Sequence, residues 1–205
     1  MAKIIYTYED PVSEKDLRQV VNCLQNDGII AYPTDVNWAF GALATSKKGL
    51  VRLLQMKPNH PKERPLALVF HSISHISQYA QVDNRVYRTL KKILPGPYTI
   101  ILPRAKSLPK QLDDKRKLIG IRLPKRELVI ELVQRLGVPL ATTSLPQTED
   151  SSQIFGYEVD DKYGHALDLV VDLGIGLNQL ETTILNLSDD STEVIRQGIG
   201  EIDSI

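Results

Sequence analysis

Residues 13–35 read SEKDLRQVVNCLQNDGIIAYPTD, and this stretch alone predicts a helix that runs directly into a strand. Its apolar residues recur with the i, i+3, i+4, i+7 spacing of one helix face, namely Leu17, Val20, Val21 and Leu24. Ser13, followed three residues later by Asp16, resembles a capping box, so we expect an amphipathic helix over roughly residues 14–27. The apolar run Ile29–Tyr32 follows at once and is typical of a buried strand.

The same alternation of short apolar runs and helical patterns continues along the chain. Runs typical of strands are Ile29–Tyr32, Leu66–Phe70, Tyr98–Leu102, Ile119–Leu123, Leu169–Leu173, Thr183–Leu187 and Val194–Ile195. Helical patterns occur near Lys47–Met56, Asn84–Leu94 and Glu127–Leu136. Interleaved strands and helices predict an α/β layer architecture, with a sheet that need not be all parallel. The polar stretch Leu145–Gly156 suits a mobile loop.

The composition is that of one globular domain. The chain has 205 residues, of which 42% are hydrophobic, and a chain of this length buries about 70% of its unfolded surface. No run approaches the roughly 18 apolar residues of a membrane span, and Met1–Asp10 lacks the apolar core of a signal peptide. The one cysteine, Cys23, lies beside the apolar stripe of the first helix, which favours a packed structural thiol. We expect a single domain over residues 10–200 in the cytoplasm.

Equal numbers of basic and acidic residues, 25 of each, hide a strong segregation of charge along the chain. Residues 85–126 hold 13 basic and 2 acidic residues, a net charge of +11, whereas residues 127–205 hold 3 basic and 15 acidic residues, a net charge of −12. Because a positive potential attracts phosphates, the middle block is a candidate for RNA binding. Its candidate contacts are Arg104, Lys106, Lys110, Lys115, Arg116 and Lys117. The plainer interpretation is a set of solvated helix faces and loops.

Generic catalytic signatures are missing from the sequence. It contains no G-x-x-x-x-G-K-[ST], G-x-G-x-x-G, H-E-x-x-H or G-x-S-x-G motif. His71 and His75 have an i, i+4 spacing but no third metal ligand nearby in the sequence, so we expect exposed histidines without a metal. We therefore assign no covalent or acid–base catalytic residue and no metal site.

The informative residues stand at the ends of predicted strands, where open α/β sheets bind their ligands. Thr34 and Asp35 follow the run Ile29–Tyr32, and Arg122 lies at the end of the run Ile119–Leu123. Further hydroxyls and an arginine occupy similar places, at Thr142, Thr143, Ser144, Thr182, Thr183 and Arg196. Hydroxyls that donate or accept, and arginines that offer a planar fork, suit an anionic ligand. The alternative is that threonine simply favours strands and that Arg122 is a surface charge.

Seven short motifs follow one another along most of the chain. They are Tyr32-Pro33-Thr34-Asp35, Pro61-Lys62-Glu63-Arg64-Pro65-Leu66, Pro95-Gly96-Pro97-Tyr98-Thr99, Ile121-Arg122-Leu123-Pro124, Pro139-Leu140-Ala141-Thr142-Thr143-Ser144, Glu181-Thr182-Thr183-Ile184 and Arg196-Gln197-Gly198. Together they resemble the YrdC-like family of L-threonylcarbamoyladenylate synthases, and most closely its YciO branch. The resemblance implies a twisted, open, mixed sheet with flanking helices and a large concave basic face, without the extra C-terminal domain of many synthases.

The resemblance also implies a reaction and its participants. L-threonine, bicarbonate and ATP, with Mg²⁺ carried by the ATP, condense to threonylcarbamoyl-AMP and pyrophosphate for the threonylcarbamoyladenosine modification of tRNA. By resemblance, threonine is held by Thr34, Arg122 and Thr182 or Thr183, and the nucleotide by Lys57, His60, Arg64, Thr143, Ser144 and Arg196. The concave face implies RNA, either tRNA or double-stranded RNA, as a partner. Such chemistry depends on positioning and charge neutralisation, which fits a sequence without a catalytic triad.

Two departures from the family pattern bear on activity. His60 stands where the family's K-x-R has its arginine, and Lys57 lies one residue from the place of the lysine. A mostly neutral imidazole cannot make a bidentate phosphate contact. The segment Ser144-Leu145-Pro146 lacks the side-chain amide of the family's S-x-N, and the loss of one such contact costs about 2–4 kcal/mol of transition-state stabilisation.

Two alternatives to a synthase therefore stay open. The first is an RNA-binding or nucleotide-binding protein of the YciO type without efficient synthase activity, whose affinity for RNA would depend strongly on salt. The second is a protein–protein adaptor in which the blocks of opposite charge pair between copies. We expect a monomer or a weak dimer and no membrane partner.

Overall fold

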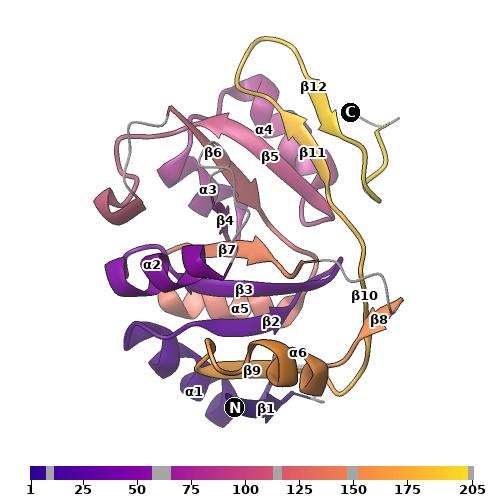
Figure 1. Ribbon diagram of the computed structural model, residues 1–205. Coiled ribbons are helices and arrows are strands. Elements are labelled where there is room, and N and C mark those ends of the chain that lie inside the picture. Colours follow the sequence, from indigo (N-terminus) through magenta and orange to yellow (C-terminus); the bar gives the residue numbers. More distant parts are fainter. Residues whose placement is uncertain (8–11, 57–65, 113–116, 147–151, 203–205) are drawn as a thin grey trace.

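Within residues 1–7, 12–56, 66–112, 117–146 and 152–202, which the computed structural model describes, ten strands form one twisted sheet (Figure 1). Their order across the sheet is β1 (Lys3–Tyr6), β9 (Leu169–Asp172), β2 (Ile30–Pro33), β3 (Trp38–Leu43), β7 (Leu140–Ser144), β4 (Ala67–Val69), β6 (Leu118–Arg122), β5 (Tyr98–Pro103), β11 (Thr183–Asn186) and β12 (Glu193–Arg196). The sheet contains both parallel pairs, such as β4–β6, and antiparallel pairs, such as β2–β3. The predicted α/β class with a mixed sheet is confirmed.

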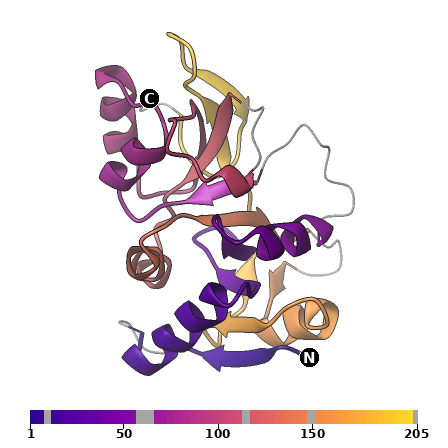
Figure 2. The ribbon, with the colours of Figure 1, turned by 90° about the vertical axis from the view of Figure 1, so that its left-hand side faces the viewer.

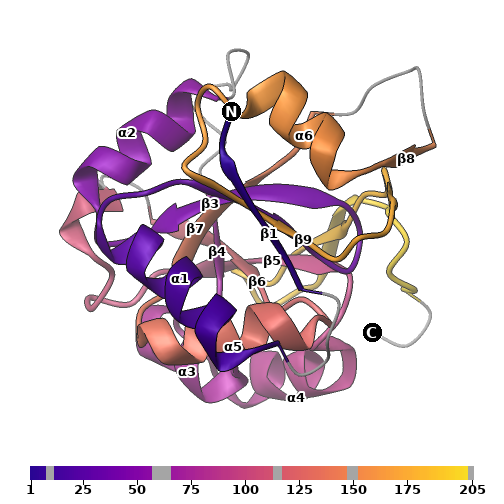
Figure 3. The same cartoon turned by 90° about the horizontal axis from the view of Figure 1, so that it is seen from below.

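Helices flank the sheet on two sides of the molecule (Figures 2 and 3). One side carries α1 (Glu14–Gln25), α5 (Glu127–Leu136), α3 (Ile73–Tyr79) and α4 (Asn84–Ile93), and the other carries α2 (Lys47–Gln55) and α6 (Gly156–Tyr163). Figure 3 shows β1 and β9 crossing β5 at a steep angle. The cause is the right-handed twist of every strand pair, which accumulates across ten strands.

Because of the twist, the sheet face that α1 and α5 cover at one end of the sheet is less covered at the other end. Over β2, β9 and β3, apolar residues of this face are covered by α1 and α5, and Tyr32 belongs to the same buried cluster as Leu17 and Leu132. Over β5 the opposite face is the buried one, so Ile100 and Leu102 are buried while Thr99 and Ile101 are only half-buried. The half of the sheet formed by β6, β5 and β11 therefore has a more open face, and Thr99 lies on it.

Local sequence explains where the first and fifth helices begin and end. Ser13 caps α1, because its Oγ accepts the N–H of Asp16 at 3.1 Å, as the capping pattern predicts. The helix ends at Gln25, two residues before the predicted end, and Asp27 adopts a left-handed φ of 63°. Gly137 has a φ of 67° and terminates α5, a conformation that glycine adopts without steric cost.

Several elements differ from the sequence prediction. The strand β3 was not predicted, because all six of its residues are buried and its apolar side chains do not alternate with polar ones. The segment expected to be a loop, Leu145–Gly156, contains the strand β8 (Gln153–Ile154), which pairs antiparallel with β10 (Leu177–Asn178). The unpredicted elements also include β1, β7, α3 and α6.

Candidate active site

A tight turn between β2 and β3 holds Thr34. The Thr34 hydroxyl donates to the carbonyl of Asn37 at 2.7 Å and accepts the N–H groups of Val36 and Asn37, both at 3.2 Å. A hydroxyl has one donor and two acceptor positions, so these three bonds use all of them. Thr34 therefore shapes the turn and presents the next residue, Asp35, toward the end of β6.

The carboxylate of Asp35 faces the guanidinium of Arg122 across the sheet. Arg122 Nη2 donates to Asp35 Oδ1 at 2.6 Å, and both side chains are less than one-tenth exposed. The backbone N–H of Lys125 donates to Asp35 Oδ2 at 3.0 Å, and Arg122 Nη1 donates to the carbonyl of Tyr98 at 3.2 Å. Arg122 is thus a buried, paired arginine, and the alternative of a surface charge is wrong.

A second arginine holds the same turn from α5. Arg126 Nη2 donates to the carbonyl of Thr34 at 3.1 Å. The neighbouring Arg126 Nε is buried without a hydrogen-bond partner. A buried donor without a partner lowers the stability of the fold unless a water or a ligand accepts its hydrogen bond. Arg126, which the sequence analysis did not select, is therefore a further candidate for the site.

A row of polar side chains continues from Arg122 along the open sheet face. Ile100 of β5 pairs with Ile121 of β6, which sets Thr99 beside Arg122. Thr99 Oγ1 lies 2.9 Å from Thr182 Oγ1, and Arg196 Nη2 donates to Thr182 Oγ1 at 3.1 Å. We call Arg122, Thr99, Thr182 and Arg196 the polar row.

The polar row distinguishes between the two threonines that the sequence left as alternatives. The Thr183 hydroxyl donates to the carbonyl of Gly200 at 2.8 Å and accepts the N–H of Gly198 at 3.0 Å, away from the polar row. Thr182 is therefore part of the polar row, whereas Thr183 binds the C-terminal segment. Arg196 is also paired, because its Nη1 donates to Glu181 Oε1 at 2.6 Å.

The end of β7 contributes the two other predicted hydroxyls. Thr143 is buried, and its Oγ1 has no hydrogen-bond partner. Ser144 follows it and is exposed at the strand end. The preceding Thr142 is engaged instead with the hydroxyl of Tyr32 at 2.7 Å, and burial raises the pKa of Tyr32 to about 12. Of the three, Thr143 and Ser144 have hydroxyls suited to a ligand.

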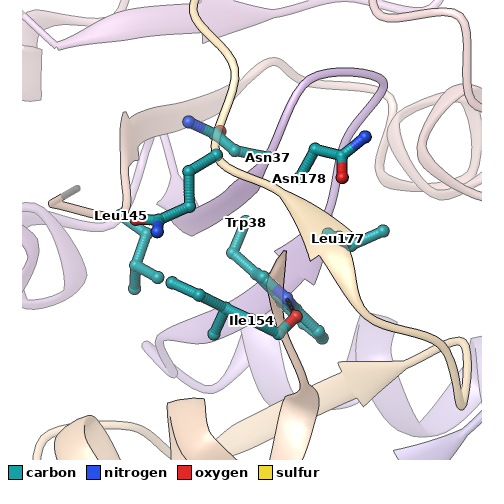
Figure 4. Close-up of a pocket in the computed structure, with 7 residues that line it drawn as sticks. Asn37, Trp38, Leu145, Ile154, Leu177 and Asn178 are labelled. Atoms are coloured by element: carbon teal, nitrogen blue, oxygen red, sulfur yellow. Dashed lines mark hydrogen bonds between the residues drawn. The ribbon is translucent and has the colours of Figure 1, made fainter. Parts of the chain in front are cut away.

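A small pocket lies beside the turn (Figure 4). Its empty volume is about 190 Å³, including the part open to solvent, and its lining residues are Asn37, Trp38, Leu145, Ile154, Leu177, Asn178 and Gln179. Trp38 Nε1 donates to the carbonyl of Ile154 at 2.8 Å, and Asn37 Nδ2 donates to the carbonyl of Leu180 at 3.0 Å. Leu145, the middle residue of Ser144-Leu145-Pro146, thus forms an apolar part of the pocket wall.

The predicted RNA contacts lie at the other end of the strands. Lys106, Lys110 and Lys117 are exposed and Arg104 is half-buried, all in the connection between β5 and β6. Six-residue β5 separates this connection from Thr99 by roughly 16 Å, at about 3.3 Å per residue. The basic residues Lys57, His60, Arg64, Lys115 and Arg116 lie outside the described residues.

The structure corrects the prediction for one histidine. His75 was expected to be exposed, but it is 3% exposed and packs among the rings of Phe70, His71 and Tyr79. Both of its ring nitrogens lack a hydrogen-bond partner. The apolar positions Ile73 and Ile76 place one face of α3 against the core, and His75 lies beside that face.

Other predicted features concern cysteine, metals and membranes. Cys23 is half-buried, and burial raises the pKa of its thiol to about 11, as expected for an unreactive structural thiol. Within the described ranges, no three histidine, cysteine, aspartate or glutamate side chains gather as a metal site would require. No helix in those ranges is long and apolar enough to cross a membrane.

Comparisons with known proteins were made for sequence and for structure. The profile of the Sua5/YciO/YrdC family, described as "Telomere recombination", matches residues 22–198. The crystal structure of Escherichia coli YciO superposes with a TM-score of 0.89 at 32% identity, covering 99% of this chain and 98% of that one. A Mus musculus threonylcarbamoyl-AMP synthase is 33% identical over 179 residues, which are 84% of this chain and 62% of that protein.

A further solved structure is similar in fold. It is P. abyssi Sua5 complexed with L-threonine, with a TM-score of 0.81 at 21% identity, covering 95% of this chain and 57% of that one. At this identity the similarity concerns the fold alone.

Proposed function

The chain belongs to the Sua5/YciO/YrdC family, and from this premise we propose that it condenses L-threonine, bicarbonate and ATP to threonylcarbamoyl-AMP. The product would serve the threonylcarbamoyladenosine modification of tRNA. The observation that carries the proposal is the polar row, which gathers Arg122, Thr99, Thr182 and Arg196 on an open sheet face. A relative of the same fold binds L-threonine, which supports the choice of substrate.

Arg122 is the proposed anchor for the threonine carboxylate. Two of its five N–H groups donate to Tyr98 and Asp35, and the other three have no partner among the described residues. Those donors suit a carboxylate, because a guanidinium binds it through a planar fork. Next to Arg122, the hydroxyls of Thr99 and Thr182 are placed for the polar atoms of the amino acid. Thr34 acts by holding the turn, since its own hydroxyl is fully bonded.

The nucleotide is proposed to lie toward β7 and β12. The unpartnered hydroxyl of Thr143, the exposed hydroxyl of Ser144 and the guanidinium of Arg196 are the described groups that would contact it. Lys57, His60 and Arg64 are proposed to complete this part of the site from outside the described residues. Mg²⁺ bound to the triphosphate would neutralise charge on the leaving pyrophosphate.

The protein's contribution to the reaction is positioning and charge neutralisation. A carbamate oxygen, formed from threonine and bicarbonate, attacks the α-phosphorus of ATP, and the bond to pyrophosphate breaks. Arg122 would fix the carboxylate end of the carbamate, while Arg196 would offset negative charge on the phosphates. Because these groups are held before substrate binds, little reorganisation is needed at the moment of reaction.

One observation favours a second function, RNA or nucleotide binding without efficient synthesis. Pro146 stands where the family's S-x-N has its side-chain amide, and the exposed cations of the β5–β6 connection stand apart from the polar row. In that case the protein would hold RNA at the connection, with the nucleotide site weakened. The two functions are compatible, because the two surfaces are separated by the length of β5.

The test is release of pyrophosphate from ATP, Mg²⁺ and bicarbonate, with and without L-threonine. We compare the wild type with R122K, which keeps the charge opposite Asp35 but removes the fork. R135K is the matched control, because Arg135 is exposed on α5 and its ion-pair partners among the described residues are Glu14 and Glu131. We expect threonine-dependent release that falls at least tenfold in R122K and is unchanged in R135K. Wild-type release that is independent of threonine, measured at one turnover or more, would reject the synthase.

A further inference from the structure

We propose that Asp35 makes the Arg122 site selective for zwitterionic amino acids over simple carboxylic acids. The inference rests on the proposed function and deepens it by naming a specificity-determining residue of the same site. Its basis is the buried contact between Asp35 Oδ1 and Arg122 Nη2 at 2.6 Å, with side chains 9% and 7% exposed.

The pair is fixed and has no net charge. Both oxygens of Asp35 are held, one by Arg122 and the other by the N–H of Lys125, so the carboxylate cannot swing away when a ligand arrives. A second carboxylate on Arg122 would then lie close to that of Asp35. Like charges repel, so a ligand with a negative charge alone binds less well than the arginine by itself would allow.

An ammonium group on the ligand reverses this penalty. In an α-amino acid the ammonium and the carboxylate are on the same carbon atom. If the carboxylate binds Arg122, two hydrogen bonds of about 3 Å each separate its oxygens from those of Asp35, and the ammonium on the adjacent carbon can lie at a similar distance, roughly 6 Å from Asp35. Unit charges at that distance change a binding constant roughly tenfold at an effective dielectric constant of about 40, between the protein and water values.

The other charges near Arg122 do not supply the same effect. Arg126 reaches the carbonyl of Thr34 and is positive, so it attracts anions of both kinds. Among the described residues, Glu181 is the other carboxylate of this region, and its side chain is 47% exposed, so solvent screens its charge far more than that of buried Asp35. Asp35 is therefore the negative group that can distinguish a ligand with an ammonium from one without.

The experiment compares two ligands that differ only in the amine. L-threonine and (R)-3-hydroxybutyrate share the carboxylate, the hydroxyl and the methyl group. Their dissociation constants are measured by calorimetry and by the fluorescence of Trp38, the one tryptophan of the chain, which lies at the base of the turn. Because both ligands use Arg122, any misplacement of the guanidinium weakens both, and the ratio of the two constants isolates the effect of charge.

The variant is D35N, with D168N as its matched control. Asp168 also pairs with an arginine, Arg52, at 2.9 Å, but stands at the opposite end of β9 and β2. We expect the wild type and D168N to prefer L-threonine at least tenfold, and D35N to lose about tenfold of that preference.

Each other outcome overturns a stated claim. An unchanged ratio in D35N overturns the role of Asp35, while the proposed function stands. Equal wild-type affinities for the two ligands overturn it as well, and that measurement needs no variant. Wild-type protein that binds neither ligand rejects Arg122 as a carboxylate site, and with it both the proposed function and this inference.

Discussion

Replacement of His75 by phenylalanine should make the stability of the protein less sensitive to acid. Burial, and to a smaller extent the neighbouring His71, lowers the pKa of His75 from 6.5 to about 4. The folded protein thus holds this imidazole neutral, while the unfolded chain binds a proton below pH 6.5. Stability therefore falls as the pH decreases from 6.5 toward 4. The linkage relation gives a loss of about 2 kcal/mol between pH 7 and pH 5 from this one group.

H75F should remove that loss without breaking the core. The ring of phenylalanine fits among three aromatic neighbours whose centroids lie 4.4–5.3 Å from that of His75. It also removes two buried nitrogens that lack partners, so we expect equal or greater stability at pH 7.

The assay is urea denaturation followed by Trp38 fluorescence at pH 7 and pH 5. The unfolding free energy of H75F minus that of the wild type should increase by about 2 kcal/mol from pH 7 to pH 5. H165Q is the control, because His165 is exposed, and its difference from the wild type should not change. A pH-independent difference for H75F would show that His75 is hydrated or bonded in solution and would refute the reasoning.

Three more predictions concern the site and the fold. T182V should raise the KM for L-threonine severalfold with little change in melting temperature, whereas T183V should lower the melting temperature, since its hydroxyl holds Gly198 and Gly200; equal effects on KM would contradict the assignment. G137A should lower the unfolding free energy by about 1 kcal/mol in urea denaturation, because alanine is strained at a φ of 67°. K106A/K110A should weaken RNA binding and reduce its salt dependence, measured by fluorescence anisotropy at about 50 and 200 mM salt; an unchanged salt slope would place the RNA elsewhere.

The sequence predicted a site at strand ends from patterns that are visible in a single chain, with Thr34 after one apolar run and Arg122 near the end of another. In the sheet, β2 and β6 run in opposite directions, so the meeting of these two ends does not follow from a shared carboxyl edge of parallel strands. What the sequence did not predict are the partners. The pairing of Asp35 with Arg122 joins residues 87 positions apart, and Thr99 enters the polar row only through the register of β5 on β6.

The other two differences between the sequence prediction and the structure, at His75 and at β3, come from burial that the sequence does not reveal. His75 stands among serine residues, which suggest an exposed surface, yet α3 turns this side chain toward Phe70. Likewise Trp38–Leu43 has no alternation to reveal a strand, since both of its faces are covered. Periodicity of apolar residues reveals a helix or strand that has one buried face, but it gives no signal for a strand whose two faces are both buried.

The strand order has a consequence for the newly made chain on the ribosome. The N-terminal strand β1 finds its partner in β9, 166 residues later at the pair Lys3–Leu169, and β2 lies on the other side of the same late strand. Until residue 172 has been synthesised, the first quarter of the protein holds sheet edges with no partner, and such edges attract other chains. The period in which these edges are open to pairing with other chains therefore lasts until β9 emerges near the end of translation.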